Sequence, residues 1–426
     1  MIARAVSTAV PLAEPQGAVL RYARWGLYLT VAALPLYTVR WHYGPLPTTL
    51  TETLILATVG LYVAGRWRDG LRRPLATPFD IAIIALLVAG VIAVLVADDR
   101  RAALGLYRAY FLEPVALFYV AVDLIRRESD VKGLILSFAI GSSAFALLNL
   151  GVFTKALLDH RVFVGNAPNA LYGDANYVAM YLEPPFAFAA GLLMIARSRP
   201  WRLLGAAWLL LTGAALVLTF SKGAYLALLV LVAVIVITAP RWGAAAIGGL
   251  VAAVIATSQV PLLMARLATV QSSLDGRSEM FTAGLAAIQQ HPVFGVGLGG
   301  YDYKFRHTMS TIYPHNIWLT FWVEVGILGL AAFAFVYLTA LWRGWTLWRP
   351  ADGFWKPVVW GIVGAFVLWF AHGMVDSPYW KNDMSVEFWM LVALVLVAER
   401  AIRRPAPQEA PVSTATPSVL EPSAAK

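Results

Sequence analysis

The residues best suited to chemistry lie in the stretch 271–330, the longest interval between the apolar segments of this chain. Arg277 opens an amphipathic part of this stretch, four glycines follow between residues 295 and 300, and Tyr313-Pro314-His315-Asn316 leads into the next apolar segment. A guanidinium binds anions, and an imidazole with an unperturbed pKa of about 6.5 can take a proton from a hydroxyl at neutral pH. This combination predicts the reaction chamber of a membrane enzyme, with the other segments as its scaffold.

Arg277 is expected in the first turn of a helix that Ser273 or Asp275 caps and that ends near Gln290. Apolar residues recur along it at helical spacing, so the helix would be amphipathic and lie on the membrane surface or on the bundle. At a helix N-terminus, backbone N–H groups and the positive end of the dipole favour an anion such as a diphosphate. A salt bridge from Arg277 to Asp275 or Glu279 is the structural alternative.

Lys222 lies in a very short turn between two apolar runs. A lysine at such a depth is costly unless it faces a wet cavity or a partner, so it is either an anion ligand or one half of an ion pair. A lone histidine is more often structural than catalytic, but His315 is flanked by Pro314 and Asn316 and followed by Glu324. These neighbours favour a role for His315 as a general base.

Two further polar patches are expected on the same face. One is Gly173-Asp174-Ala175-Asn176-Tyr177, after a polar loop that holds Arg161, and the other runs from His372 to Asp383. For Asp174 and Asp376 the simpler interpretation is that they tie helix ends together. The candidate substrate-binding residues are Arg161, Asp174, Asn176, Asn316, Asp376 and Lys381. No metal-ligand spacing, phosphate-binding glycine loop or nucleophile elbow is present, so we expect no metal and no cofactor.

The composition sets the fold class. Of the 426 residues, 60% are hydrophobic and 13% are charged, and none is cysteine. Apolar runs long enough to cross a hydrocarbon core of about 30 Å recur along the chain. The sequence therefore predicts an all-α, polytopic transmembrane bundle of about twelve spans, placed at 25–40, 48–65, 79–97, 104–124, 133–154, 176–196, 202–219, 223–240, 243–260, 316–342, 356–376 and 384–400.

The positive charges predict the topology. With the N-terminus in the cytoplasm, the short inner loops hold most of the lysine and arginine residues, as the positive-inside rule requires. This bias accounts for the net charge of +9 without a nucleic-acid partner. Both termini would be cytoplasmic, with segment 1–24 preceding spans 25–260, one large outer loop at 261–315, spans within 316–403 and a disordered tail at 404–426. Cations left on the outer face suggest an anionic ligand there, although anchoring to lipid headgroups is an alternative for some of them.

At this point the residues resemble the O-antigen ligase and polymerase superfamily of bacterial envelope enzymes. The motifs that carry the resemblance occur in order over roughly 160–385. They are Gly-Asp-Ala-Asn-Tyr at 173–177, Ser-Lys-Gly-Ala-Tyr at 221–225, Gly-Arg-Ser-Glu-Met at 276–280, His-Pro-Val-Phe-Gly-Val-Gly at 291–297, Pro-His-Asn at 314–316, Glu-Val-Gly-Ile-Leu-Gly at 324–329 and Asp-Ser-Pro-Tyr-Trp-Lys-Asn-Asp at 376–383. No single motif is specific, whereas the ordered set is fairly specific.

The resemblance implies a multi-pass protein of the bacterial inner membrane whose large loop and active site are periplasmic. It implies inverting, metal-independent transfer of a glycan from undecaprenyl diphosphate to a sugar hydroxyl, for example on the lipid A core. His315 would be the general base, while Arg277 and Lys222 would stabilise the diphosphate. Lys222 departs from the arginine usual in the ligases, so the charge is kept and the bidentate fork is lost.

Other functions stay open on the sequence. Polymerisation of lipid-linked repeat units, or assembly of another envelope polysaccharide, differs from ligation only in the acceptor. A transporter of an anionic solute would also have many spans and polar clusters. Transporters often contain internal repeats and charges near the membrane midplane, and neither feature is evident here.

Overall fold

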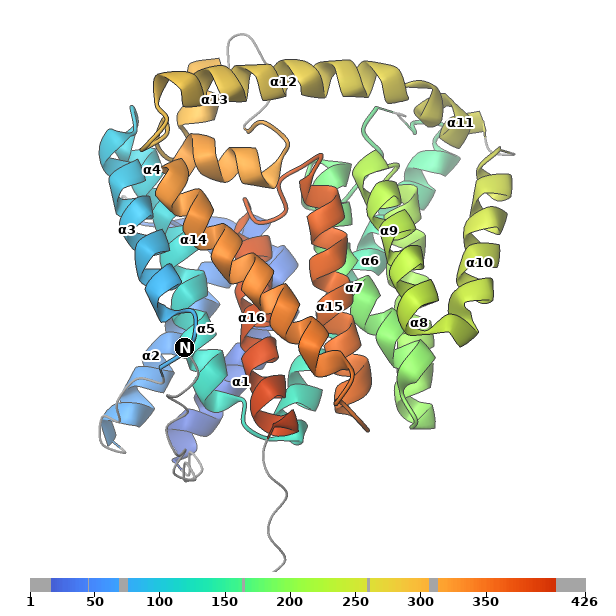
Figure 1. The fold of residues 1–426 in the computed structure, drawn as a ribbon, viewed down its shortest axis with the longest axis horizontal. Helices are drawn as coiled ribbons and strands as arrows, with labels where there is room; N and C mark the ends of the chain where they lie inside the picture. The colour runs from blue at the N-terminus through green and yellow to red at the C-terminus, as the bar shows by residue number, and fades with distance from the viewer. Residues whose placement is uncertain are drawn as a thin grey trace, which may run out of the picture.

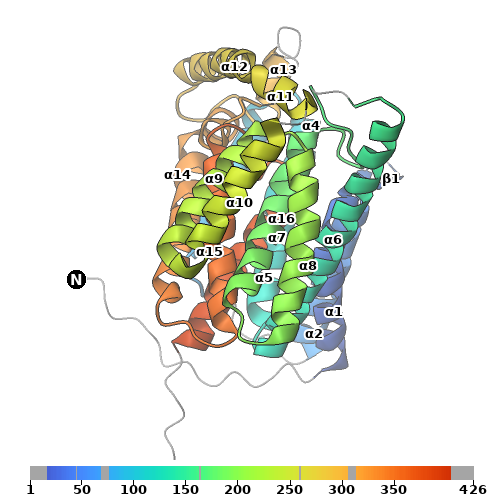
Figure 2. The same cartoon turned by 90° about the vertical axis from the view of Figure 1, so that its right-hand side faces the viewer.

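The computed structural model describes residues 17–44, 46–68, 76–162, 165–258, 261–305 and 313–403. In this part the chain is a bundle of long, roughly aligned helices, with one amphipathic helix lying across one end (Figure 1). The bundle and the crossing helix are also seen when the molecule is turned by 90° (Figure 2). We call this end, crossed by α12 (Val270–Gln290), the α12 end of the bundle.

The first half of the chain forms part of the helical bundle and a small hairpin. The elements are α1 (Ala18–Ala32), η1 (Leu34–Thr38), β1 (Arg40–Tyr43), β2 (Leu46–Thr49), α2 (Leu50–Arg68), α3 (Asp80–Val96), α4 (Arg100–Tyr107), η2 (Arg108–Leu112), α5 (Glu113–Leu124) and α6 (Glu128–Leu158). Strands β1 and β2 pair antiparallel with Arg40 opposite Thr49. The hairpin was not expected from the sequence.

The second half supplies the central helices and the segments at the α12 end. The elements are α7 (Ala175–Ile195), α8 (Arg199–Leu218), α9 (Lys222–Thr238), α10 (Pro240–Ser258), α11 (Pro261–Ala268), α12, α13 (Gly300–Phe305), α14 (Ile317–Trp348), α15 (Trp355–Gly373) and α16 (Asn382–Ile402). The described chain is thus almost entirely helical, which confirms the expected all-α class.

Five of the described helices, namely α6, α7, α8, α14 and α15, are long and apolar enough to cross a membrane. Two shorter apolar helices are α3 and α9. The protein is therefore a multi-pass membrane protein. Each of the twelve expected spans coincides with helical structure, but crossing by all twelve stays a prediction. The first span is displaced, because α1 ends at Ala32 and Pro35 initiates a 3-10 turn where 25–40 was expected to continue.

The centre of the bundle is formed by α7, α15 and α16, which are buried over most of their length. Glycines let α7 and α15 approach closely: a Cβ at Gly191 would lie 2.7 Å from the Pro357 carbonyl oxygen, and one at Gly361 would lie 2.5 Å from the Phe188 ring. Small residues at helix interfaces are the usual means of close packing in membranes. These contacts hold α7 and α15 together at the ends opposite to the start of α7 and the end of α15, where the polar residues lie.

The glycine cluster between residues 295 and 300 docks into a kink of α14. Gly326 interrupts the helix with φ of 78° and ψ of 179°. At the kink the Val296 N–H donates to the Val323 carbonyl at 2.7 Å, and the Ile327 N–H donates to the Val293 carbonyl at 3.0 Å. A Cβ at Gly295 would lie 2.3 Å from the Val323 carbonyl oxygen, so only glycine allows this approach. These contacts anchor the segment that follows α12 to the kink of α14.

Candidate functional site

His315 and Asp376 form a hydrogen-bonded pair at the α12 end. Nδ1 of His315 lies 3.0 Å from Oδ1 of Asp376. His315 directly precedes α14, and its backbone has φ of 52°, a left-handed conformation that is uncommon outside glycine. Its side chain is 21% exposed, whereas that of Asp376 is 0% exposed. The imidazole therefore reaches the surface of the site while its carboxylate partner is buried beneath it.

Three groups donate hydrogen bonds to Asp376. Besides His315, the Ser377 N–H donates to Oδ1 at 2.8 Å, and Nδ2 of Asn176 donates to Oδ2 at 3.1 Å. The Asn176 N–H in turn donates to Oδ1 of Asp174, which caps α7, at 2.8 Å. Asp174, Asn176 and Asp376 thus tie the start of α7 to the loop after α15. These contacts match the simpler interpretation from the sequence, in which Asp174 and Asp376 tie helix ends together.

The charges of the pair determine its protonation. Burial alone would raise the pKa of Asp376, but the charge of His315 and its hydrogen bond, with help from the Ser377 N–H, lower it to about 2. Burial alone would lower the pKa of His315, but the charge and hydrogen bond of Asp376 outweigh it, so the net shift is upward. The charge of Arg277 lowers the pKa of His315, whereas the charge of Asp174, like that of Asp376, raises it. An ionised Asp376 holds a proton on Nδ1 of His315 and leaves Nε2 as the basic nitrogen.

Arg277 lies next to this pair but not in a first helical turn. Helix α12 begins at Val270, with Thr269 as its N-cap, so the expected cap at Ser273 or Asp275 is wrong. Gly276 does not break the helix, because a glycine inside a helix costs only about 1 kcal/mol. Nε of Arg277 donates to the Val375 carbonyl at 3.0 Å, one residue before Asp376.

Lys222 occupies the first turn of α9, whose N-cap is Ser221. Its Nζ lies 2.6 Å from the carbonyl oxygen of Thr269 and 2.9 Å from its Oγ1. Lys222 therefore contacts the N-cap of α12, whereas Arg277 projects from α12 to the loop after α15. At 1.5 Å per residue, Thr269 and Arg277 lie about 12 Å apart along the helix. Both cations reach the α12 end of the bundle, as the sequence predicted, but they are not in contact there.

Lys381 and two tyrosines extend the site. Nζ of Lys381 lies 3.8 Å from the centroid of the Tyr177 ring, a cation–π contact. The rings of Tyr177 and Tyr313 are 6.4 Å apart, and those of Tyr313 and His315 are 5.2 Å apart. Burial lowers the pKa of Lys381, and the nearby Asp383 and Asp174 partly offset this. Lys381, Tyr177 and Tyr313 thus form a continuous row that ends at the imidazole.

The two remaining candidates lie in different settings. Asn316 caps α14 by accepting the Leu319 N–H at 3.0 Å, and its Nδ2 donates to the Met374 carbonyl at 3.1 Å. Arg161 is exposed in the loop after α6, and no side-chain contact in the described part of the chain joins it to the other candidates. The structure therefore brings together His315, Asp376, Asn176, Asp174, Arg277, Asn316 and Lys381, with Lys222 farther along α12 and Arg161 apart.

Glu324 does not accompany His315, contrary to what its sequence position suggested. Its carboxylate accepts the N–H groups of Gly299 and Tyr301 and so caps the start of α13. The pairing of His315 with Asp376 was not predicted, because 61 residues separate them and no local spacing announces the contact. The only signal in the sequence was that each is a polar residue at the end of an apolar segment.

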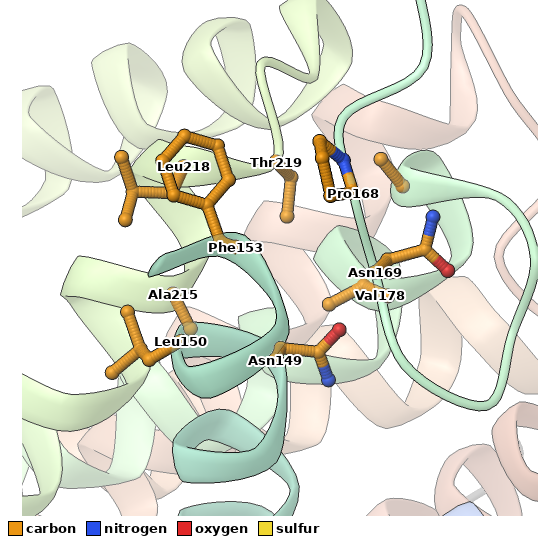
Figure 3. A pocket seen from close by; sticks show the side chains of 10 residues that line it. Asn149, Leu150, Phe153, Pro168, Asn169, Val178, Ala215, Leu218 and Thr219 are labelled. Atoms are coloured by element: carbon orange, nitrogen blue, oxygen red, sulfur yellow. The ribbon is translucent and has the colours of Figure 1, made fainter. Parts of the chain in front are cut away.

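A small cavity lies beside the site, between the ends of α6, α7 and α8 (Figure 3). Its lining combines apolar side chains such as Phe153 and Val178 with the polar side chains of Asn149, Asn169 and Thr219. Its volume is about 10 Å³, which is roughly the space for one water molecule and too small for a sugar.

Parts of the chain are similar to known proteins. The family model described as O-antigen ligase matches residues 205–334, which include Lys222, Arg277 and His315. An uncharacterized protein from Haemophilus influenzae is 35% identical over 81 residues, a match that covers 16% of this chain and 20% of that protein. The chain thus matches only about a fifth of that relative's length. The match over residues 205–334 confirms that the chain resembles the O-antigen ligase superfamily.

Proposed function

We propose that this protein transfers a glycan from undecaprenyl diphosphate to a hydroxyl of an acceptor sugar. The observation that carries the proposal is the His315–Asp376 pair beside Arg277. His315 and Arg277 lie within the segment that matches the O-antigen ligase family, and Asp376 lies outside it. A buried carboxylate bound to one nitrogen of a partly exposed imidazole is the usual arrangement of an oriented general base. The site would face the periplasm, in a bacterial inner-membrane protein with both termini in the cytoplasm.

In the proposed reaction, Nε2 of His315 takes the proton of the acceptor hydroxyl. The hydroxyl oxygen attacks the anomeric carbon, the bond from that carbon to the diphosphate oxygen breaks, and undecaprenyl diphosphate leaves with the bonding electrons. Attack opposite the leaving group inverts the anomeric configuration. Asp376 stabilises the imidazolium that forms, which is a positioning role and replaces the substrate contact expected for it from the sequence.

Arg277 and Lys222 would neutralise the charge that grows on the leaving diphosphate, without a metal ion. Arg277 and Thr269, the residue that Lys222 contacts, are about 12 Å apart along α12, so the diphosphate would lie between the two cations. Both side chains are long and can swing from the carbonyls of Val375 and Thr269 onto the phosphate oxygens. The lipid chain of the donor would leave sideways between helices into the bilayer.

The remaining candidates would contact the sugars. Lys381 over the Tyr177 ring offers a cation and an aromatic face beside the base, and Asn316 and Arg161 offer polar groups at the rim. Asn176 and Asp174 would act through Asp376, to which they are linked. The acceptor distinguishes a ligase, which uses the lipid A core or another glycan, from a polymerase, which extends a second lipid-linked unit.

The experiment that tests the proposal is transfer from a synthetic undecaprenyl-diphosphate glycan by purified protein. The wild type is compared with His315→Ala, and His42→Ala on the exposed strand β1 serves as the control. Lipid A core and unmodified donor are offered as acceptors. Product on the core identifies a ligase, and elongated donor identifies a polymerase.

We expect His315→Ala to remain folded and to lose transfer, whereas His42→Ala keeps it. Transfer that persists in His315→Ala would show that another group is the base. Absence of product with either acceptor, from protein that binds the donor, would overturn the proposal and favour transport of an anionic solute.

A further inference from the structure

A second histidine–carboxylate pair lies inside the bundle, beneath the first. Nδ1 of His372 on α15 lies 2.5 Å from Oε1 of Glu183 on α7, and both side chains are 0% exposed. Ionisable residues inside a membrane protein are costly and usually functional. The reaction proposed above does not use this pair.

The backbone carbonyl of His372 contacts the loop after α15, and its ring contacts α9. Its carbonyl oxygen accepts the N–H groups of Val375 and Asp376, both at 2.9 Å. These two residues carry the carbonyl that receives Arg277 and the carboxylate that receives His315. The backbone of His372 therefore anchors the loop that orients the base.

The imidazole of His372 faces the first turn of α9. A Cβ added at Gly223 would lie 2.4 Å from Nε2 and 2.5 Å from Cδ2 of His372, so the ring edge presses against this glycine. Gly223 follows Lys222 directly. Nε2 of His372 has no hydrogen-bond partner among the described residues, and neither has Oε2 of Glu183. The position of the ring is thus set by its bond to Glu183 and by its contact with the α9 backbone.

We propose that His372, held by Glu183, is a positioning residue that sets the separation between Lys222 on α9 and the Val375–Asp376 segment. The ring acts as a spacer between the turn that carries one cation and the loop that holds Arg277 and His315. This inference rests on the proposed function for its effect on transfer, but the spacing itself can be measured without substrate.

Two variants disturb the spacer from opposite sides. His372→Asn keeps an N–H near the place of Nδ1 for Glu183 and removes the ring edge that touches Gly223. Gly223→Ala drives a Cβ into the ring. Since displacement of catalytic groups by about 1 Å can cost about 100-fold in rate, we expect losses of that order in both single variants. The double variant should be more active than Gly223→Ala alone, because the smaller side chain makes room for the Cβ.

The absence of cysteine from the sequence allows a direct measurement of the spacing. Cysteines introduced by Leu226→Cys on α9 and Met374→Cys after α15, both at exposed side chains, carry two spin labels. Paramagnetic resonance then reports their separation in the wild type, in His372→Asn and in Gly223→Ala. His42→Asn is the matched control and should change nothing.

A purely structural role for His372 would lower the yield of folded protein and leave the folded fraction normal. A positioning role shifts or broadens the label separation in well-folded protein. It also moves the acid limb of the pH–rate profile, because a displaced Asp376 acts less strongly on His315, which Arg277 and Asp174 also face. Wild-type spacing, rate and pH profile in folded His372→Asn would overturn the inference. If the wild type transfers no glycan, the proposed function fails, and the label separation still decides the inference.

Discussion

Replacement of Asp376 by asparagine tests how the carboxylate acts on His315. Oδ1 of Asp376 binds Nδ1 of His315 at 3.0 Å and also accepts the Ser377 N–H. A backbone N–H can only donate, so the introduced amide should place its oxygen at the Oδ1 position and keep the proton on Nδ1. Asn176 can turn its own amide to present oxygen to the new NH₂ group. The substitution thus removes the charge and preserves the contacts.

The expected loss follows from the strength of the hydrogen bond in the imidazolium-like transition state. A hydrogen bond to a charged group is worth about 1.5–3 kcal/mol, against about 0.5–1.5 kcal/mol between neutral groups. The difference of about 1–2 kcal/mol corresponds to a decrease in kcat of about 5- to 30-fold. The carboxylate raises the pKa of His315, so its removal lowers that pKa. A base with a lower pKa stays unprotonated to lower pH, and the acid limb of the pH–rate profile moves to lower pH.

The assay is the initial rate of transfer from the synthetic donor as a function of pH, for protein shown to be folded and to bind the donor. Asp352→Asn, at an exposed carboxylate paired with Arg197, is the control and should leave rate and profile unchanged. An Asp376→Asn protein with wild-type kcat and an unmoved acid limb would refute the assignment of His315 and Asp376 as base and orienting group.

Further predictions concern the two cations Arg277 and Lys222, the dependence of transfer on a metal ion, and the kink of α14. Arg277→Lys should lower the rate of transfer by about tenfold or more, because a charged hydrogen bond is lost. Lys222→Arg keeps the charge and gains a bidentate guanidinium, so it should lower the rate less. The reverse order of the steady-state rates would contradict the assignment of these cations to the diphosphate. Transfer activity should persist in EDTA. A loss of activity that added divalent cation restores would contradict metal-independent transfer and would indicate that carboxylates of the site hold a metal ion. Gly326→Ala should reduce stability by about 1–3 kcal/mol, seen as a lower unfolding temperature in detergent, because φ is 78° and a Cβ would lie 2.3 Å from the Val293 carbonyl oxygen. Gly105→Ala, where a Cβ meets open space, should be neutral, and equal behaviour of the two variants would disprove the strain.

Much of the fold could be predicted from the sequence, because in a membrane a helix must satisfy its own backbone hydrogen bonds. Apolar length then locates helices one by one, and α7 and α8 lie within a few residues of the expected spans. The limits of α1 and α12 were predicted less well. The end of α1 depends on Pro35, and the start of α12 depends on whether the helix continues through Gly276. The free-energy differences that decide these limits are only about 1–3 kcal/mol.

The sequence by itself determined the fold class, the resemblance to the O-antigen ligase superfamily and the choice of His315, Arg277 and Lys222 as candidates, because residue type and local order carry this information. Only the tertiary structure decided which residues meet. The contact of His315 with Asp376 and that of His372 with Glu183 depend on how α7, α14 and α15 pack. The residues of the first pair are 61 positions apart in the sequence, and those of the second pair are 189 positions apart. Hydrophobic patterning indicates that a helix is buried but not which polar groups share its interior. Those pairings follow from the packing of whole helices, for example the close contact of the His372 ring with Gly223 of α9, and this packing sets the geometry of the site.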